Sequence, residues 1–395
     1  MEERTVAYLR GAFKRHYEAT TVSPPPAPNE REWGYIPWTA EAQTTMVRHR
    51  SWLDVGNLGR FLTEERPQHV YFSAARYRDP SANSMSRKDW QGTDLVFDLD
   101  ADHLPGVDPE TTTYAEMLAA CKDALLDLLD VLEDDFGFED CTVVFSGGRG
   151  YHVHVRDDGV QELGRGDRRE VVEYVLAESL DLDALLEREL VDGMGLENPT
   201  EKRTLSTTGG WGKRVHDRLL ALVDEVRAMD DEEDRLERLQ AYDGIGQGSA
   251  EKLVEVFDAN YDQIAAGNVE VHGRFLTLAR QVAAETFDAE SAPIDEPVTT
   301  DINRLIRLPG SLHGGTGLEV KRIPRENVAD FDPLVDAVSS TFADEGDAEL
   351  VVDVTEPVEV ELGGDTFTLE AGASTVPEYV GVFAMARGHA EIAKQ

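Results

Sequence analysis

Apolar and polar residues recur along the chain with two periods, and each period predicts one kind of element. Apolar residues three and four positions apart share one face of a helix, whereas alternate residues share one face of a strand. The first period predicts helices over 3–19, 113–136 and 377–393. The second predicts strands over 69–73, 95–100, 142–145, 151–155, 351–354, 358–362 and 366–369. Gly363 and Gly364 fit a hairpin turn between the last two strands.

The middle of the chain differs, because from about 168 to 286 the pattern is helical with acidic turns. We expect a helical insert over 166–289 between two parts of one catalytic domain, 1–165 and 290–395. After the insert, a short helix is predicted over 301–307, closed by Pro309 and Gly310. The predicted fold class is α/β or α+β, with mixed sheets that carry the chemistry, flanking helices and the helical insert.

The charge of the chain changes this picture more than its length does. With 395 residues, 41% of them hydrophobic, the chain is typical of a globular protein, but 38 basic against 78 acidic residues make its formal net charge −40. DNA phosphate repels such a chain at low salt, because nucleic-acid binding depends on Lys and Arg. At 1 M salt the Debye length is only about 3 Å, which screens that repulsion. We therefore interpret the acidity as an adaptation to salt-accumulating cytoplasm, with an acidic interaction protein as the alternative.

Cysteine usage and hydropathy bear on the compartment. Cys121 and Cys141 are the only cysteines and lack C-x-x-C spacing, which favours two buried thiols over a disulfide framework or a zinc site. The N-terminus has no basic segment followed by an apolar run, and no stretch approaches 18 apolar residues. We expect a cytoplasmic protein with no membrane partner.

The strand predicted over 95–100 carries the strongest local signal for chemistry. Asp98 and Asp100 share one face of this strand, while its apolar residues face the core. Two neighbouring carboxylates repel each other unless a cation lies between them, and hard oxygen ligands suit Mg²⁺ or Mn²⁺. Such a pair is used in two-metal phosphoryl transfer. The alternative is a solvated acidic strand end.

A glycine-rich loop follows the strand predicted over 142–145. Its sequence S-G-G-R-G-Y-H presents Ser146, Arg149 and His152, and closely spaced glycines let backbone N–H groups approach an anion. Arg149 can hold phosphate oxygens with two hydrogen bonds, and His152 shares a strand face with His154. The alternative is an ordinary glycine turn beside core histidines. No Gly-Lys-Ser/Thr follows, so this is not a Walker A loop.

A third polar segment runs from 293 to 317 and concentrates acid, Arg, Ser and His. Arg304 and Arg307 share one face of the predicted helical turn, which suits a triphosphate or a template phosphate. Asp301 fits the N-cap of that turn, so we prefer Asp295 as a metal ligand. A structural ion pair is the alternative for Arg304.

Together these segments resemble the archaeal and eukaryotic DNA primase small-subunit family. The resemblance spans about 10–325 and includes 31–35, 46–49, 71–75, 90–103, the loop at 146–152 and the run at 304–317, while 382–388 also looks familial. It implies a DNA-directed nucleotidyltransferase that makes short primers on single-stranded DNA template from nucleoside triphosphates, with a primase large subunit as partner.

The family's site residues fall on matching positions of this chain. The resemblance implies metal ligands at Asp98, Asp100 and Asp295 for Mg²⁺ or Mn²⁺. It implies nucleotide-binding residues at Ser146, Arg149, His152, Arg307 and His313. Glu32 and Arg48 match supporting polar positions.

The sequence also departs from the family and adds one motif. Archaeal relatives often carry a Cys/His zinc knuckle after the D-x-D strand, but only Cys121 follows here, so no structural zinc is expected. Gly148 stands where some eukaryotic relatives have a second Arg. The run 243–253 resembles the helix-hairpin-helix turn that binds DNA phosphate, with a plain glycine-rich helical hairpin as the favoured alternative.

Three other functions compete with priming. A primase-superfamily repair polymerase would use the same site, and a non-catalytic nucleic-acid scaffold would not need all three carboxylates. A small-molecule metallohydrolase would use paired carboxylates without the Arg and His set. The residues favour the priming enzyme.

Overall fold

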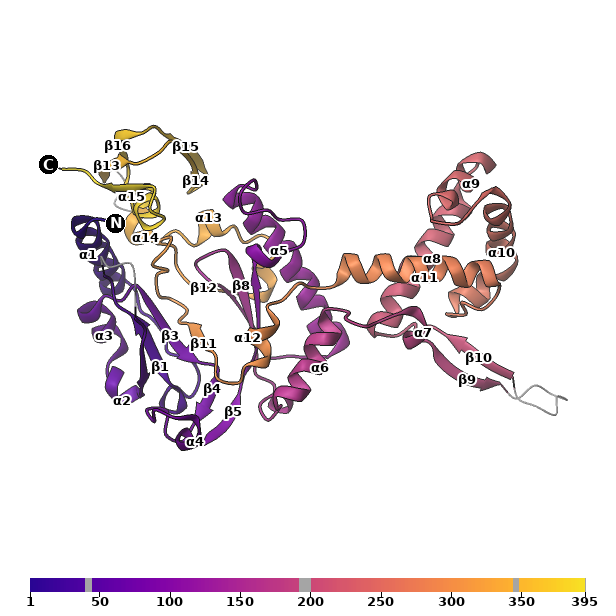
Figure 1. The fold of residues 1–395 in the computed structure, drawn as a ribbon, viewed down its shortest axis with the longest axis horizontal. Coiled ribbons are helices and arrows are strands. Elements are labelled where there is room, and N and C mark those ends of the chain that lie inside the picture. Colours follow the sequence, from indigo (N-terminus) through magenta and orange to yellow (C-terminus); the bar gives the residue numbers. More distant parts are fainter. Residues whose placement is uncertain (40–44, 192–199, 344–347, 395) are drawn as a thin grey trace. The chain divides into compact units, whose positions relative to one another are not determined.

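The computed structural model describes residues 1–39, 45–191, 200–343 and 348–394 (Figure 1). The chain divides into two compact units, the first comprising Met1–Leu126, Phe138–Val172 and Pro293–Gln395 and the second Asp127–Gly137 and Glu173–Ala292. The bounds of the second unit differ from the predicted insert, 166–289, and they include a segment before it, 127–137. Across the described residues, no helix has the length and apolar character needed to cross a membrane.

Two four-stranded antiparallel sheets form the framework of the first unit. The first sheet has the order β11-β3-β1-β2, with strands Leu305–Arg307, His69–Ser73, Trp33–Ile36 and Val47–Arg50. The second has the order β12-β7-β8-β6, with strands Lys321–Ile323, Cys141–Phe145, Gly150–Val155 and Leu95–Asp100. This antiparallel architecture, combined with separate helices, confirms the α+β class.

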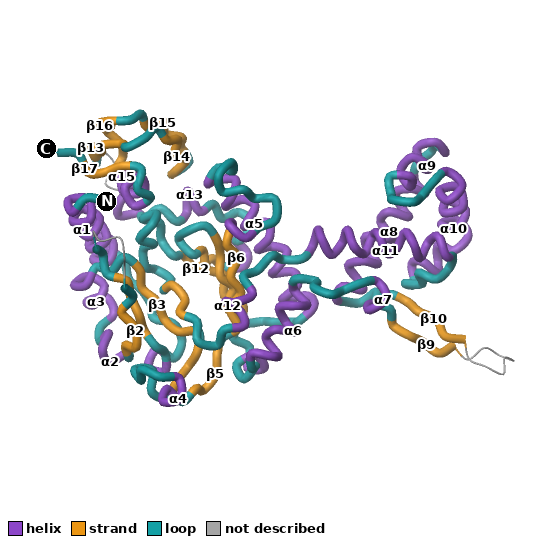
Figure 2. Tube along the Cα trace, in the orientation of Figure 1, coloured by secondary structure: helices purple, strands orange, loops and turns teal. Residues whose placement is uncertain are grey.

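The other strands of the first unit form smaller antiparallel groups (Figure 2). They are the pair β4 and β5 (Ala75–Tyr77, Trp90–Thr93), the sheet β16-β13-β17 (Gly372–Pro377, Glu349–Val354, Ala390–Ile392) and the hairpin β14 and β15 (Val358–Leu362, Asp365–Leu369). Gly363 and Gly364 join the hairpin with φ of +67° and +87°. The predicted glycine turn is therefore confirmed, because both positions need the left-handed region that glycine adopts freely.

Ten helices that lie wholly or partly in the first unit accompany these sheets in the described ranges. They are α1 (Glu3–Ala19), α2 (Trp52–Val55), α3 (Leu58–Glu65), α4 (Met85–Lys88), α5 (Tyr114–Asp130), α6 (Arg165–Val175), α12 (Glu296–Thr300), α13 (Pro333–Asp336), α14 (Ser340–Ala343) and α15 (Glu378–Ala386). Helix α1 has the predicted bounds and buries Leu9, Phe13 and Tyr17 on one face. Helix α5 ends earlier than predicted, and a π-helical turn, Val131–Asp135, continues it.

The second unit has a hydrophobic core of its own. Its members include Trp211, Val215, Leu253, Phe257 and Phe275, all of them buried. The helices are α7 (Leu182–Leu185), α8 (Gly210–Ala228), α9 (Glu232–Gln240), α10 (Gln247–Ala265) and α11 (Gly273–Glu290). The all-helical expectation for 168–286 is wrong over the antiparallel pair β9 and β10 (Glu187–Val191, Thr200–Thr204). The two strands pair mainly with each other, with one further bridge from Thr204 to Asn268, and their charged residues hide the alternation that would have revealed them.

Two further element predictions are wrong, both because a distant strand supplies the pairing. The helix predicted over 301–307 is the strand β11, which pairs with β3 so that Ile306 lies opposite Phe72. Arg304 and Arg307 therefore do not share a helical face, and Asp301 ends α12 and accepts a hydrogen bond from the Asn303 N–H at 2.9 Å. The helix predicted over 377–393 ends at Ala386, because Gly388 takes a φ of +82° and the chain then pairs with β13 as β17.

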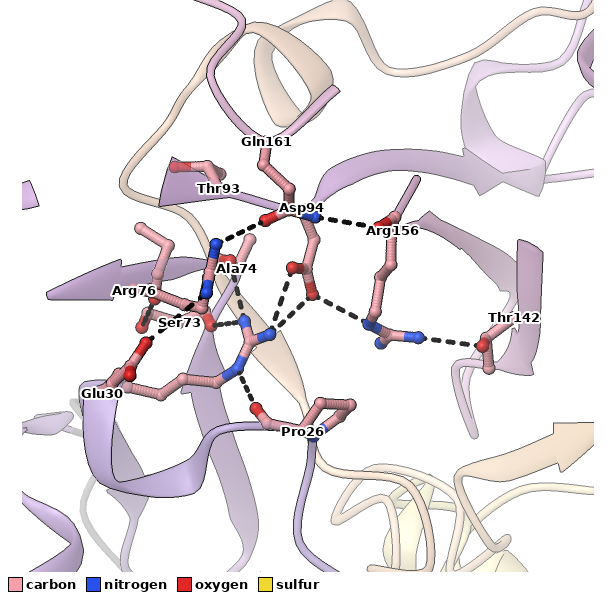
Figure 3. Close-up of polar contacts among 12 residues, drawn as sticks. Pro26, Glu30, Ser73, Ala74, Arg76, Thr93, Asp94, Thr142, Arg156 and Gln161 are labelled. Atoms are coloured by element: carbon pink, nitrogen blue, oxygen red, sulfur yellow. Dashed lines mark hydrogen bonds and ion pairs between the residues drawn. The ribbon is translucent and has the colours of Figure 1, made fainter. Parts of the chain in front are cut away.

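A buried ion-pair network joins the two large sheets (Figure 3). Arg31 donates to both carboxylate oxygens of Asp94 at 2.9 and 3.1 Å and to the carbonyls of Ser73 and Ala74 at 2.8 Å. Arg156 donates to the same carboxylate at 3.1 Å. Because Arg31 precedes β1 and Asp94 precedes β6, the network fixes the starts of strands from both sheets.

Candidate active site

The pairing of β6 with β8 creates the centre of the candidate site. In this register Asp98 lies opposite His152, and Asp100 lies opposite Gly150. The His152 Nε2 is 3.2 Å from the Asp98 Oδ1. Burial alone would raise the pKa of Asp98, but His152, Arg307 and Arg304 together outweigh burial and lower it. Asp98 is therefore an ionised carboxylate inside a largely buried site.

Asp295 follows the second unit in the sequence, where the chain returns to the first unit, and it lies beside Asp98. It precedes α12, and its backbone N–H donates to the Asp98 carbonyl at 2.8 Å. Burial raises the pKa of Asp295, and the negative charges of Asp98 and Asp100 add to the effect. The three predicted carboxylates thus repel one another across one site, which is the electrostatic situation that a bound cation relieves.

These carboxylates face a cleft of about 470 Å³. Its lining combines them with basic and polar groups that come from both large sheets and from the segments beside them: Met46, Arg48, Tyr71, Asp98, Asp100, His103, His152, Asp295, Val298, Asp301, Asn303, Arg304, Leu305, Ile306 and Arg307. The structure therefore brings Arg304 and Arg307 to the same cleft, although the predicted helix does not exist.

The glycine loop between β7 and β8 is a tight turn. The Ser146 N–H donates to the Gly150 carbonyl at 2.9 Å, and the Ser146 hydroxyl accepts from the Gly148 N–H at 3.3 Å. Gly147 has a φ of +76°, and a Cβ there would lie 2.6 Å from the His313 Cβ. Glycine is therefore required at 147 both by backbone conformation and by the close approach of His313.

Arg149 leaves this loop toward Asp100, the last residue of β6, and Asp102 in the turn that follows. Its guanidinium lies 2.5 Å from the Asp102 Oδ2 and 3.7 Å from the Asp100 Oδ1, and the side chain is 44% exposed. The ion pairs hold Arg149 at the mouth of the site while leaving it open to solvent. An anion bound there would meet a guanidinium that is already oriented.

His313 closes the other side of the glycine loop. Its Nδ1 lies 3.1 Å from the Thr316 hydroxyl, which in turn donates to the Gly147 carbonyl at 2.5 Å. Burial lowers the pKa of His313 far below its ordinary value, and Arg307 and His69 lower it further. His313 is therefore a neutral ring at physiological pH, able to donate or accept one hydrogen bond at Nε2.

Arg307 lies on β11 with its guanidinium 5.9 Å from the centre of the Tyr71 ring. Its Nε is buried and has no hydrogen-bond partner. Within the ranges described above, no carboxylate forms an ion pair with it. An unpaired buried donor on a cation indicates a place for an anionic ligand.

Glu32 and Arg48, the two supporting positions, contact each other. Arg48 donates to the Glu32 carboxylate through Nε at 3.2 Å, and the buried Lys88 ammonium donates to the same carboxylate. The His49 N–H also donates to it at 3.0 Å. Burial would raise the pKa of Glu32, but these donors outweigh it and lower the pKa. Glu32 is buried and does not line the cleft, but its partner Arg48 does.

Some residues differ from the sequence interpretation. His154 shares a strand face with His152, but it is fully buried against Phe72 and does not line the cleft. Conversely, the sequence did not single out His69, Tyr114 or Arg387, which lie beside the glycine loop or His313. Only the familial look of 382–388 pointed toward Arg387.

The run 243–253 lies in the second unit, where it follows α9 and continues into the first turns of α10. Ile245, Ala250 and Leu253 are buried in the core of that unit, which accounts for the apolar positions of the pattern. Gly244 has a φ of +71°, which accounts for one glycine. A Cβ at Gly246 or Gly248 would meet nothing within 4 Å, so packing does not require these two glycines.

Comparison with known proteins identifies one family, by a family model and by individual relatives. The family model for the DNA primase small subunit matches residues 97–324. The DNA primase small subunit PriS of Haloarcula marismortui is 59% identical over 396 residues, covering the whole of both chains. The proteins of the same name from Natronomonas pharaonis and Methanococcoides burtonii are 58% and 38% identical, each covering 99% of both chains.

Proposed function

The chain belongs to the DNA primase small-subunit family, and from this premise we propose how its site makes primers. The protein is the catalytic subunit of a DNA primase, a nucleotidyltransferase of DNA replication. We propose that it joins nucleoside triphosphates into short primers on a single-stranded DNA template. A primase large subunit would act as its partner, and work on chromosomal DNA would place it in the cytoplasm.

One observation carries this proposal. Acidic and basic residues from segments before and after the second unit face one cleft, where Asp98 and Asp295 are linked by a backbone hydrogen bond of 2.8 Å. Nucleotidyl transfer needs carboxylates near the reacting phosphate and cations near the leaving group. Asp98, Asp100 and Asp295 supply the first group, and Arg149 and Arg307 supply the second.

The three carboxylates suit Mg²⁺ or Mn²⁺, since hard oxygen ligands and mutual repulsion favour a divalent cation. No group of three His, Cys, Asp or Glu side chains in the described part of the chain is arranged to hold a metal ion by itself. Mg²⁺ is commonly held by one or two carboxylates together with substrate phosphates, which fits this arrangement. When bound, such ions would lower the pKa of the attacking hydroxyl and offset negative charge on the phosphates. Structural zinc is not expected.

The reaction would proceed by in-line displacement. The 3′-hydroxyl of one nucleotide attacks the α-phosphate of another, a new P–O bond forms, and pyrophosphate leaves. The Ser146 hydroxyl and the Arg149 guanidinium would bind the triphosphate, while Arg307 and neutral His313 would orient it. His152 would stay beside Asp98 and hold that carboxylate in position. Glu32 would fix Arg48 at the cleft wall.

The net charge of −40 is compatible with binding of a DNA template when the salt concentration is high. Relatives from Haloarcula and Natronomonas share most of this sequence, which supports a halophilic chain. At molar salt the long-range repulsion from DNA is screened, so recognition depends on the arginines of the cleft rather than on overall charge.

Primer synthesis on single-stranded DNA with Mg²⁺ or Mn²⁺ at molar KCl tests the proposal, with the large subunit added if the chain alone is inactive. The variant Asp98→Ala plus Asp100→Ala should lose synthesis while remaining folded at the assay temperature, as circular dichroism would show. Glu359→Ala plus Glu361→Ala is the matched control, because these glutamates have the same spacing on the exposed face of β14. Synthesis that survives in the aspartate variant would refute the site. A metal analysis with stoichiometric zinc would refute the expectation of no zinc.

A further inference from the structure

A smaller pocket of about 340 Å³ adjoins the cleft, and the two share Asp100 and Arg307 in their linings. Its other walls are the glycine loop with Ser146, Gly148 and Arg149, the segment of His313, Gly315 and Thr316, and the C-terminal residues Ala386, Arg387 and His389. The C-terminal end of the chain thus contributes to the place where the glycine loop would bind phosphate.

Arg387 follows α15 directly and is held in place by aromatic rings. Its guanidinium carbon lies 4.3 Å from the centre of the Tyr114 ring and 5.5 Å from that of Phe383. The Tyr114 hydroxyl donates a hydrogen bond to the Gly148 carbonyl. One aromatic side chain therefore connects Arg387 to the glycine loop, and the stacking limits the guanidinium to few orientations.

Several other arginines of the first unit have acidic partners. Arg31 and Arg156 share Asp94, and Arg149 contacts Asp102. Arg387 lacks such a partner: among the described residues, no carboxylate forms an ion pair with it, and its polar side-chain contacts are the His389 ring, at 3.5 Å from the Arg387 Nε, and the Tyr114 hydroxyl. Arg307, which lines the same pocket, likewise has no carboxylate partner in the described ranges.

The charge balance of the smaller pocket points to an anion. Arg149, Arg307 and Arg387 line it together with a single carboxylate, Asp100. Arg149 has Asp102 and Asp100 as partners, whereas Arg307 and Arg387 are uncompensated in the described ranges. Both of them, with Arg149, lower the pKa of His313, so their positive charges act on the same ring. Like charges held this close are stabilised by a polyanion between them.

We infer that Arg387 binds the terminal phosphate of the incoming nucleoside triphosphate. This inference rests on the proposed function. Asp98 and Asp295 line only the larger cleft, whereas Arg387 lines only the smaller pocket. The α-phosphate, which reacts, belongs beside the carboxylates, so the end of the triphosphate that extends past Asp100 and Arg307 reaches Arg387. Its role is recognition of the triphosphate group.

Binding of ATP and ADP to the full chain, with Mg²⁺ at molar KCl, tests this role, because ADP lacks the terminal phosphate. Arg387→Gln should weaken ATP binding about 10- to 100-fold, as expected for the loss of charge-assisted hydrogen bonds to phosphate, and leave ADP binding nearly unchanged. Arg387→Lys should fall between, since Lys keeps the charge but loses the fork geometry. Arg60→Gln, at an exposed position of α3, is the charge-matched control and should bind both nucleotides like the wild type.

A second pair of assays, with and without a preformed primer, distinguishes the triphosphate of the incoming nucleotide from that of the initiating nucleotide. In extension of a preformed primer with a 5′-hydroxyl, only the incoming nucleotide carries a triphosphate, so Arg387→Gln should raise KM with a smaller change in kcat. A defect confined to synthesis without a primer would assign Arg387 to the initiating nucleotide and overturn the inference.

Equal losses of ATP and ADP affinity, or a lowered thermal unfolding midpoint that accounts for the loss, would also overturn it. Unchanged ATP affinity in Arg387→Gln would do the same. Failure of the proposed function is distinguishable, because then the wild-type chain with its large subunit would make no primers at all.

Discussion

Asp94 is a buried carboxylate that two arginines share, and its removal gives the sharpest stability prediction. Its side chain is 2% exposed, and that of Arg31 is 1% exposed. Asp94→Asn keeps the size of the side chain and removes its charge. Arg31 and Arg156 would then be buried without a counter-charge, although the carbonyls of Ser73 and Ala74 still accept from Arg31. Burial already lowers the pKa of Arg31, and the loss of Asp94 would remove the main opposing effect.

The expected cost is about 3–5 kcal/mol of unfolding free energy, the range found when one partner of a buried ion pair is removed. Exposed pairs contribute about 0–1 kcal/mol. Asp89→Asn is therefore the matched control, because Asp89 pairs with Arg78 at 2.9 Å with side chains 51% and 74% exposed. Molar KCl would screen the exposed pair further and leave the buried pair nearly unaffected.

Urea unfolding followed by tryptophan fluorescence at constant molar KCl measures both variants. All tryptophans except Trp211 belong to the first unit, so the signal reports mainly on the unit that contains the network. A loss below about 1 kcal/mol for Asp94→Asn, equal to that of Asp89→Asn, would refute the reasoning, because it would mean that water or rearrangement compensates both arginines.

Three further predictions follow from the site. Gly147→Ala should lower the unfolding free energy by about 1–3 kcal/mol and abolish most primer synthesis, because φ at this position is +76° and the new Cβ would lie 2.6 Å from His313. Gly148→Ala, whose Cβ would lie 3.3 Å from the His313 ring, should have a milder effect on both quantities. Equal effects of the two variants in urea unfolding and primer assays would contradict this prediction. Burial lowers the pKa of His69 to about 3, so this ring stays neutral in the folded state but takes up a proton in the unfolded state below about pH 6.5. The unfolding free energy should therefore fall by about 1–2 kcal/mol between pH 7 and pH 5. His69→Gln should lose less stability over the same range, as urea midpoints at both pH values would show. Burial and neighbouring carboxylates raise the pKa of Asp295, so its ionisation lowers the stability of the folded state as the pH rises above the ordinary pKa of an aspartate. In EDTA at neutral pH, Asp295→Asn should therefore unfold at a higher temperature than the wild type. The variant should also lose primer synthesis and the stabilisation that added Mn²⁺ gives the wild type.

Local pattern in the sequence was sufficient for the elements at the centre of the site. Alternation over 95–100 predicted β6 with its bounds, and the same alternation placed Asp98 and Asp100 on one face. The glycine loop was predicted between two strands, and Gly147 has the positive φ that such a loop requires. These features depend on neighbours within a few residues, which is why they could be predicted from the chain alone.

Two of the errors occurred where the partner of a segment lies far away in sequence. The segment 305–307 has few residues of its own to specify a strand, and it pairs with β3, more than 230 positions earlier. The C-terminal segment 390–392 likewise becomes a strand because β13 offers an edge. Propensity is a weak guide in such short segments, since tertiary pairing overrides it.

The sequence by itself determined the family, the acidic character and the polar residues of the site, because each depends on residue identity or on short spacing. The tertiary structure decided how these residues meet. Antiparallel pairing set His152 opposite Asp98, a backbone hydrogen bond joined Asp295 to the same residue, and β11 carried Arg307 into the cleft. It also brought Arg387 from the C-terminal segment to the glycine loop, a meeting of distant segments that only long-range packing could bring about.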